Sequence, residues 1–323
     1  MWYFIYILLH LENVIGLRSD AFSLAFDYYS YREVKYLCYL TCDNHFNNKN
    51  IAKKFVKHNV RVSVGLIHRD LELDLERLLY QWDAAVGVML DGSCDSAQDT
   101  LKEASKSMLL GSMHMWLVLN EDSDNCTMTH YEYTDETFQG LNLSIDADVI
   151  YASNCGSHYE LTDVFNFGRI QGNNLEKNRV GVWTRNSGLL VSLKGFKYYN
   201  RWDFHNLTLR AVSVILDQPK VFYPEMLSEE GHTPGVSSMT KVGSQLLNIL
   251  KLQHNFRFNY TIVGRWIGSP ERNSTLAVTN SLYWREQDIS STCTRLFPAW
   301  LQWMDPFFPP ATYLEYIYEY IVN

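Results

Sequence analysis

Two spacings of apolar residues alternate along the first half of the chain. Apolar or alternating runs rich in β-formers predict strands at Val34–Leu40, Val60–Ile67, Ala84–Leu90, Met115–Leu119, Asp148–Ser153 and Arg179–Trp183. Between them, apolar residues recur every three or four positions and predict amphipathic helices around Ile51–Val56, Leu71–Leu79 and Leu101–Met108. Strands and helices that alternate at this spacing predict a parallel, doubly wound α/β sheet.

A second series of elements follows a break in this pattern. The stretch Lys194–Asn206 is polar, basic and aromatic without periodicity. Beyond it, Leu209–Leu216 and Phe256–Val263 predict strands, and the apolar row from Met239 to Leu250 predicts a helix between them. We therefore expect an amino-terminal α/β domain over 19–195, a linker over 196–208, and the first part of a second domain over 209–323.

The beginning of the chain and its sequons bear on the compartment. Trp2–Leu11 is an apolar run of signal-peptide length, too short to span a bilayer. It predicts a signal peptide over 1–18, and a first buried strand is the alternative. Asn-x-Ser/Thr sequons, which are glycosylation acceptors in secreted chains, occur at Asn125, Asn142, Asn206, Asn259 and Asn273. Together these features favour an extracellular protein.

The six cysteines leave the disulfide pairing open. Cys38 and Cys42 lie in or beside one predicted strand, about 13 Å apart at ~3.3 Å per residue, which is too far for a bridge between them. Each must therefore pair elsewhere or stay reduced. The spacing of a structural zinc site is absent from the sequence.

Charge and motifs exclude several classes of function. The formal net charge is −8, and no Lys/Arg cluster offers a nucleic-acid surface. The sequence lacks a nucleophile elbow, a phosphate-binding loop, a dinucleotide fingerprint and a zinc-protease motif. We expect no enzyme activity, no cofactor and no metal. His114, inside an apolar strand, is interpreted as a hydrogen-bonded core or edge residue.

One polar segment is a candidate for binding an anionic small molecule. Asp288–Arg295 (DISSTCTR) brings serine and threonine hydroxyls close to an arginine. Hydroxyls, backbone N–H groups and arginine are the usual partners of a carboxylate. The structural alternative is a polar β-loop with one surface arginine.

Several segments together resemble a known family. The similar pieces, in order, are Tyr31–Cys42, Ala85–Cys94, His114–Leu119, Asp148–Ser153, Asn200–Val212, Phe258–Trp266 and Trp284–Pro306. In this order they resemble the chemosensory ionotropic receptors of insects, which are variant ionotropic glutamate receptors, and their seventy-five clade above all. The resemblance covers some 280 residues of the chain.

The resemblance implies a fold and a function. It implies an amino-terminal domain and then the first part of a ligand-binding domain, both of the periplasmic-binding-protein type. It also implies a ligand-gated cation channel that detects odorant acids or amines in sensory cilia, with a co-receptor subunit of the same family. On this basis the chain is expected to be the extracellular, ligand-sensing part of such a receptor.

Two departures from the family limit these expectations. The arginine that binds the ligand's carboxylate in glutamate-binding relatives falls at Trp300, so its role is assigned to Arg295, with Thr294 beside it, as a hypothesis. No stretch of about 20 apolar residues occurs, and Ala311–Asn323 is too short to span a bilayer. We therefore expect this chain to contain no pore.

The missing pore segment leaves other interpretations open. A truncated gene model, a splice form or a pseudogene product would each have such a sequence. A secreted small-molecule-binding protein and a non-functional truncated receptor product are the alternatives to a receptor ectodomain. We also expect the second domain to be marginally stable and to expose an apolar face.

Overall fold

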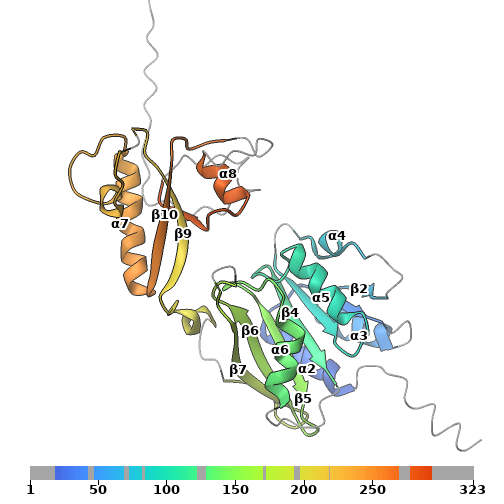
Figure 1. The fold of residues 1–323 in the computed structure, drawn as a ribbon. Coiled ribbons are helices and arrows are strands. Elements are labelled where there is room, and N and C mark those ends of the chain that lie inside the picture. Colours follow the sequence, from blue (N-terminus) through green and yellow to red (C-terminus); the bar gives the residue numbers. More distant parts are fainter. Residues whose placement is uncertain are drawn as a thin grey trace, which may run out of the picture. The chain divides into compact units, whose positions relative to one another are not determined.

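The computed structural model describes residues 19–42, 47–68, 73–81, 84–121, 129–169, 172–192, 197–217, 219–268 and 277–292. The chain divides into two compact units, Met1–Arg201 and Trp202–Asn323. Figure 1 shows the elements of each unit. The predicted signal peptide over 1–18 lies outside the described residues.

One mixed sheet organises the first unit. Its strands are β1 (Tyr36–Thr41), β2 (Arg61–Leu66), β3 (Val86–Asp91), β4 (His114–Asn120), β5 (Val149–Asn154), β6 (Tyr159–Asn166), β7 (Leu175–Thr184) and β8 (Gly188–Val191). They lie in the order β2-β1-β3-β4-β5-β6-β7-β8. The pairs among β1 to β5 are parallel, and those from β5 to β8 are antiparallel.

Helices cover both faces of this sheet. They are α2 (Ser19–Tyr31), α3 (Asn47–Val56), α4 (Leu75–Leu79), α5 (Ala97–Lys106) and α6 (Thr129–Phe138). Successive strand residues point to opposite faces. In β1, Leu37 and Tyr39 pack in the core formed with α2 and α3, whereas Cys38 and Leu40 pack in the core formed with α4, α5 and α6. Each face therefore has its own apolar core.

The unit has an α/β fold, as predicted. The predicted parallel sheet is only partly correct, because the pairs among β1 to β5 are parallel and the remaining pairs are antiparallel. Four residues (155–158) join β5 to β6, and three (185–187) join β7 to β8. Connections this short can join only antiparallel neighbours, because a parallel pair needs a crossover of a dozen residues or more. The unit is a mixed α/β sheet, compatible with a periplasmic-binding-protein-like fold.

A buried arginine fixes the end of the first unit. The 3-10 helix η1 (Lys197–Arg201) ends at Arg201, which is 2% exposed. Its guanidinium donates to both carboxylate oxygens of Asp163 in β6, at 2.9 and 2.7 Å, and to the carbonyls of Ile145 and Ala147. It also lies 3.9 Å from the centre of the Phe165 ring. A fully buried guanidinium requires such a set of partners.

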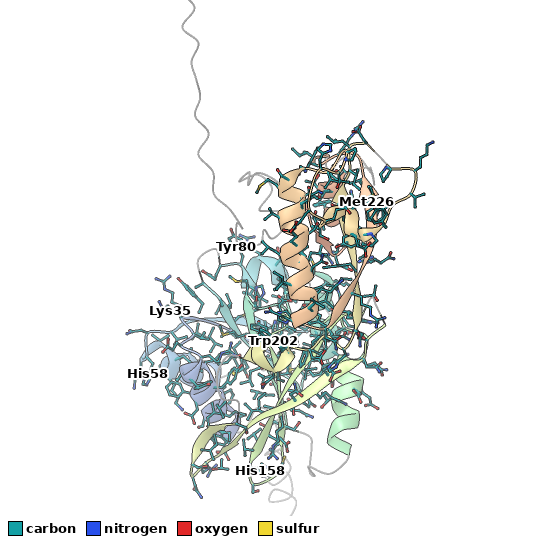
Figure 2. The ribbon with its side chains drawn as sticks, turned by 90° about the vertical axis from the view of Figure 1, so that its left-hand side faces the viewer. Lys35, His58, Tyr80, His158, Trp202 and Met226 are labelled. Atoms are coloured by element: carbon teal, nitrogen blue, oxygen red, sulfur yellow. A yellow bond between two sulfur atoms is a disulfide. The ribbon has the colours of Figure 1, made fainter. Side chains whose placement is uncertain are left out.

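The second unit begins at the next residue. Trp202, labelled in Figure 2, donates its indole N–H to the carbonyl of Gln253 at 3.1 Å. Its own carbonyl lies 3.0 Å from Nδ1 of His254. The amide of Phe204 then donates to the carbonyl of His254. The chain is therefore fixed in the first unit up to Arg201 and in the second unit from Trp202.

A small parallel sheet organises the second unit. Its elements are β9 (Leu207–Val214), the 3-10 helix η2 (Pro224–Leu227), α7 (Ser238–Gln253), β10 (Phe256–Val263), α8 (Val278–Tyr283) and β11 (Ile289–Ser290). The strand order is β10-β9-β11, with both pairs parallel. A small apolar cluster of Val212, Val214, Val263 and Val278 packs at its centre.

Helix α7 buries a largely polar face. Its buried residues are Thr240, Lys241, Ser244 and Leu247. Lys241 donates to the carbonyls of Glu229 and Gly231, which fixes the loop before α7. The apolar row that predicted the helix is exposed instead, at Val242, Leu246, Ile249 and Leu250. The helix and the exposed apolar face were predicted correctly.

Candidate ligand-binding site

The two residues predicted to bind the ligand, Thr294 and Arg295, lie outside the described residues, as does Trp300. The structure does describe the first part of the same segment, Asp288–Thr292. In the parallel pair with β9, Ile289 of β11 is in register with Ala211, and Ser290 with Val212. The polar segment therefore contains β11, the shortest described strand of the second unit's sheet.

Asp288 fixes the position of this strand. Its carboxylate accepts a hydrogen bond from the backbone amide of Arg210 at 2.8 Å. It also accepts two from the Arg210 side chain, at 3.1 and 2.5 Å. These hydrogen bonds raise the pKa of the Arg210 guanidinium. Asp288 thus has a structural role, and Arg210 is already engaged with a carboxylate of the protein itself.

Three hydroxyl side chains meet at the carboxyl ends of β9 and β11. Oγ of Ser213 lies 3.0 Å from Oγ1 of Thr292, which also accepts from the backbone amide of Val214 at 2.9 Å. The amide of Thr292 donates to Oγ of Ser290 at 3.1 Å. Ser213 and Thr292 are buried. These contacts close the turn that follows β11.

Ser291 lies between these residues and is 2% exposed. Its hydroxyl oxygen has no hydrogen-bond partner among the residues that the structure describes. A buried hydroxyl without a partner carries a desolvation cost. In parallel α/β sheets, ligands bind outside the carboxyl ends of the strands. Ser291 and its neighbours lie at that end, where a ligand's polar group would find hydroxyl donors.

Three predicted sequons lie in described residues. Asn142, Asn206 and Asn259 are all exposed, whereas Asn125 and Asn273 lie outside the described residues. An acceptor asparagine must be accessible, and these three meet that requirement. Within the described ranges, no helix combines the length and apolar character needed to cross a membrane.

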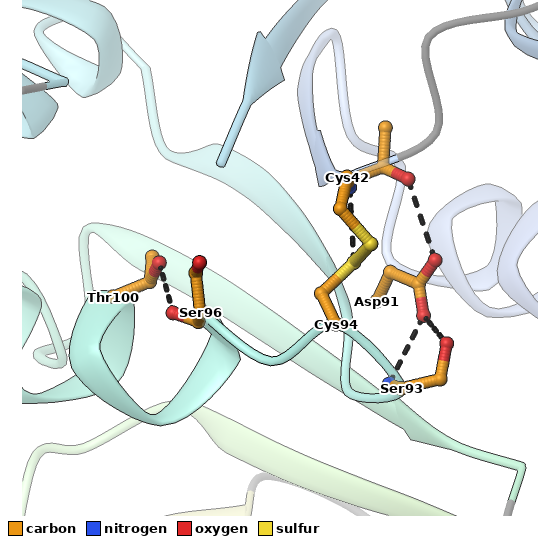
Figure 3. Close-up of a disulfide and its surroundings, with 7 residues drawn as sticks. Cys42, Asp91, Ser93, Cys94, Ser96 and Thr100 are labelled. Carbon is orange, nitrogen blue, oxygen red and sulfur yellow. Dashed lines mark hydrogen bonds between the residues drawn. A yellow bond between two sulfur atoms is a disulfide. The ribbon is translucent and has the colours of Figure 1, made fainter. Parts of the chain in front are cut away.

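A disulfide in the first unit was not predicted as a pair. Cys42 follows β1 and Cys94 follows β3, and their Cα atoms lie 5.7 Å apart (Figure 3). Cys38 is free and buried, which confirms that Cys38 and Cys42 do not pair with each other. The signal in the sequence was the position of the two cysteines, each just after a buried strand. It became decisive only once β1 and β3 were known to be neighbours.

Two groups of potential metal ligands occur in the described part of the chain, and neither suits a metal. Cys42, Asp91 and Cys94 lie close together, but both sulfurs belong to the disulfide. Cys155, His158 and Glu160 form the other group, in which Cys155 is also disulfide-bonded. A cysteine binds a metal as a thiolate, which a disulfide cannot supply. His114 is half-buried in β4, an inner strand of the sheet, and burial lowers the pKa of its imidazole.

Comparison with known proteins identifies the family. Residues 18–214 match the family model "Ionotropic receptor 75a N-terminal". Ionotropic receptor 75a of Drosophila sechellia is 31% identical over 183 residues, which are 51% of this chain and 28% of that protein. Ionotropic receptor 75a of Drosophila melanogaster is 28% identical over 200 residues, 56% of this chain and 30% of that protein. The match thus spans less than a third of these relatives, and the chain belongs to the ionotropic receptor 75a amino-terminal family.

Proposed function

We propose that this chain is the extracellular, ligand-sensing part of a chemosensory ionotropic receptor. The family match over residues 18–214 carries the proposal, since it covers the described first unit and β9. The first unit would be the amino-terminal domain, of doubly wound, periplasmic-binding-protein type. The strand order β2-β1-β3-β4-β5 and the helices on both faces support that assignment.

The second unit would be the first part of the ligand-binding domain. Its parallel strands and the hydroxyls of Ser213, Ser291 and Thr292 support this assignment. The ligand would be an odorant acid or amine. For an acid, the positive charge would come from Arg295, with Thr294 beside it, because Arg210 is already paired with Asp288.

The location and assembly follow from the same proposal. The chain would lie on the extracellular side of the plasma membrane in a receptor assembled with a co-receptor of its family. The Cys42–Cys94 disulfide and the exposed sequon asparagines support an oxidising, extracellular setting.

Ligand-dependent thermal stabilisation of the full chain tests the proposal. Short carboxylic acids and amines are titrated against the chain and against Thr292→Val, which removes the hydroxyl that contacts Ser213 and Val214. We expect a ligand to raise the melting temperature of the parent chain. The variant should bind that ligand at least tenfold more weakly, a loss of about 1.4 kcal/mol in binding free energy, because a ligand group that bonded to the hydroxyl is left without a partner.

Ser238→Ala is the matched control, because Ser238 is exposed at the amino end of α7 and the change removes a hydroxyl outside the cluster of Ser213, Ser291 and Thr292. It should bind as the parent chain does. Stabilisation that is equal in all three proteins would place binding elsewhere and contradict the role of the hydroxyls. Arg295→Ala separates the ligand classes: an acid should lose binding and an amine should keep it.

A further inference from the structure

The first unit has a pocket at the carboxyl ends of its parallel strands. It is lined by the ends of β3, β4 and β5, the first turns of α5 and the end of α6, and its volume is about 250 Å³. In this measure, a site needs only about 10 to 15 Å³ to hold one water molecule. The pocket therefore has room for a small organic molecule, at the edge of the sheet where α/β folds bind ligands.

The usual ligand position on such a sheet is closed in this protein. The strand order reverses between β1 and β3, and ligands normally bind in the crevice at that point. Here the Cys42–Cys94 disulfide joins the two strand ends (Figure 3). Asp91 is held beside it by Thr41 at 3.3 Å and by the hydroxyl of Ser93 at 2.6 Å. Cys94 also lines the pocket, so the open space begins where the disulfide ends.

The pocket wall combines an apolar surface with acceptor groups. Ala97, Leu101 and Val118 supply aliphatic carbon, and Gln98 and Asp95 supply side-chain oxygens. The amide nitrogen of Gln98 donates to the carbonyl of Thr137 at 3.0 Å, which leaves its Oε1 as the group to offer a ligand.

Charge selects the class of ligand. Among the described residues that line the pocket, which include no lysine, arginine or histidine, Asp95 is exposed and is the one side chain charged at neutral pH. A carboxylate ligand would be repelled by Asp95, whereas an ammonium group is attracted by Asp95 and can donate to Gln98. From these observations we infer that the first unit binds a small protonated amine, its ammonium group between Asp95 and Gln98 and its apolar body against Ala97, Leu101 and Val118.

This site is separate from the one proposed in the second unit. It lies wholly on elements of the first unit and uses none of Ser213, Ser291 and Thr292. A variant in one site should therefore leave binding at the other intact.

Calorimetric titration of the full chain with three probes of similar shape tests the inference. The probes are 2-phenylethylamine, 2-phenylethanol and phenylacetate, which carry a cation, a neutral hydroxyl and an anion. We expect the amine to bind most tightly and phenylacetate not to bind at this pocket. Asp95→Asn should weaken amine binding about fivefold, the range of a partly exposed charge pair. Gln98→Leu should weaken it as well, while both variants keep their fold because both side chains lie at the surface of α5 or just before it.

Asp99→Asn is the matched control: this exposed acid on the same helix is paired with Lys102 and does not line the pocket. It should bind the amine like the parent chain. The inference is overturned if the amine does not bind at millimolar concentration. It is equally overturned if Asp95→Asn and Gln98→Leu both leave amine affinity unchanged, and loss of that binding in Thr292→Val instead would place it in the second unit.

Discussion

The two units differ in the side chains that they bury. In the first unit, buried charge is paired: Arg201 meets Asp163, and both lie in a unit with apolar cores on the two faces of an eight-stranded sheet. In the second unit, Ser244 is fully buried in α7 without a hydrogen-bond partner among the described residues, while apolar side chains of the same helix face outward. The first unit thus buries apolar side chains on both faces of its sheet, whereas α7 buries a largely polar face and exposes an apolar one.

Hydrogen exchange of the full chain, read separately for each unit, tests this difference. The first unit should exchange its sheet amides in one slow, cooperative process, because its interior is packed on both sides. The sheet amides of the second unit should exchange faster, because its apolar cluster is small.

The largest expected effect comes from Arg201→Met. The variant leaves the Asp163 carboxylate buried without its guanidinium partner, which costs about 3 to 5 kcal/mol. Sheet amides of the first unit should lose that much protection. Arg185→Met is the control, because its pair with Asp20 is exposed and is worth at most about 1 kcal/mol. Adding Asp163→Leu to Arg201→Met should restore part of the loss. Equal effects of Arg201→Met and Arg185→Met would contradict the buried pair.

The next effect comes from removing the Cys42–Cys94 disulfide by a double change to serine. This bridge closes a loop across 52 positions, and its removal should destabilise the first unit by about 2 to 4 kcal/mol. The second unit should keep its exchange rates. Cys38→Ala, which alters the free buried cysteine of the same sheet, leaves the bridge in place and should cost less. A loss of protection in both units would mean that they do not unfold separately.

Two neighbouring leucines of α7 test the orientation of that helix. Leu247 is 6% exposed and Leu246 is 43% exposed. Leu247→Ala should destabilise the second unit by about 2 kcal/mol or more, whereas Leu246→Ala should stay within about 0.5 kcal/mol. Urea unfolding of the full chain, with exchange as the local readout, measures both. The reverse order would show that the apolar row faces the sheet.

The smallest effect concerns pH and Asp91. Burial is the main cause that raises the pKa of this carboxyl above its ordinary value. Between the ordinary and the raised pKa, the folded state binds more protons than the unfolded state, so this group's contribution to stability falls as the pH rises. Asp91→Asn keeps an acceptor oxygen for Ser93 and should remove this fall in the stability of the first unit as the pH rises above the ordinary pKa of an aspartate, about 4. The same pH dependence of stability in the parent chain and in Asp91→Asn would contradict this assignment.

The strands that the sequence predicted are marked by a local pattern: continuous apolar runs in those that became β1, β3 and β4, and alternation in the one that became β2. Strand β6 was missed because its interior is polar. Asp163 lies in it, buried, and its partner Arg201 is 38 positions further along the chain. The local pattern therefore carried no sign that this aspartate belongs in a core.

Helix α2 was missed for a different reason. Its buried residues, Ala21, Leu24, Ala25, Tyr28 and Tyr29, have ideal helical spacing. Phe22 and Phe26 on its flank blur the pattern, although they too pack against the same core. In α7 the spacing was recognised, but spacing identifies an apolar face without saying which partner covers it.

Of the predicted candidate site, the structure describes Asp288–Thr292, which include strand β11 of the second unit. The pairing of Asp288 with Arg210 and the contact of Thr292 with Ser213 join positions nearly 80 apart in the sequence, at separations of 78 and 79. No local pattern encodes such pairs. Arg295 and Thr294 remain predictions.

The adjacency of Arg201 and Trp202 has a practical consequence. The first is held by Asp163 and two carbonyls, and the second is held at Gln253 and His254. A single planar peptide group joins these two residues. A truncation meant to separate the units without removing contacts from either therefore has to fall between Arg201 and Trp202.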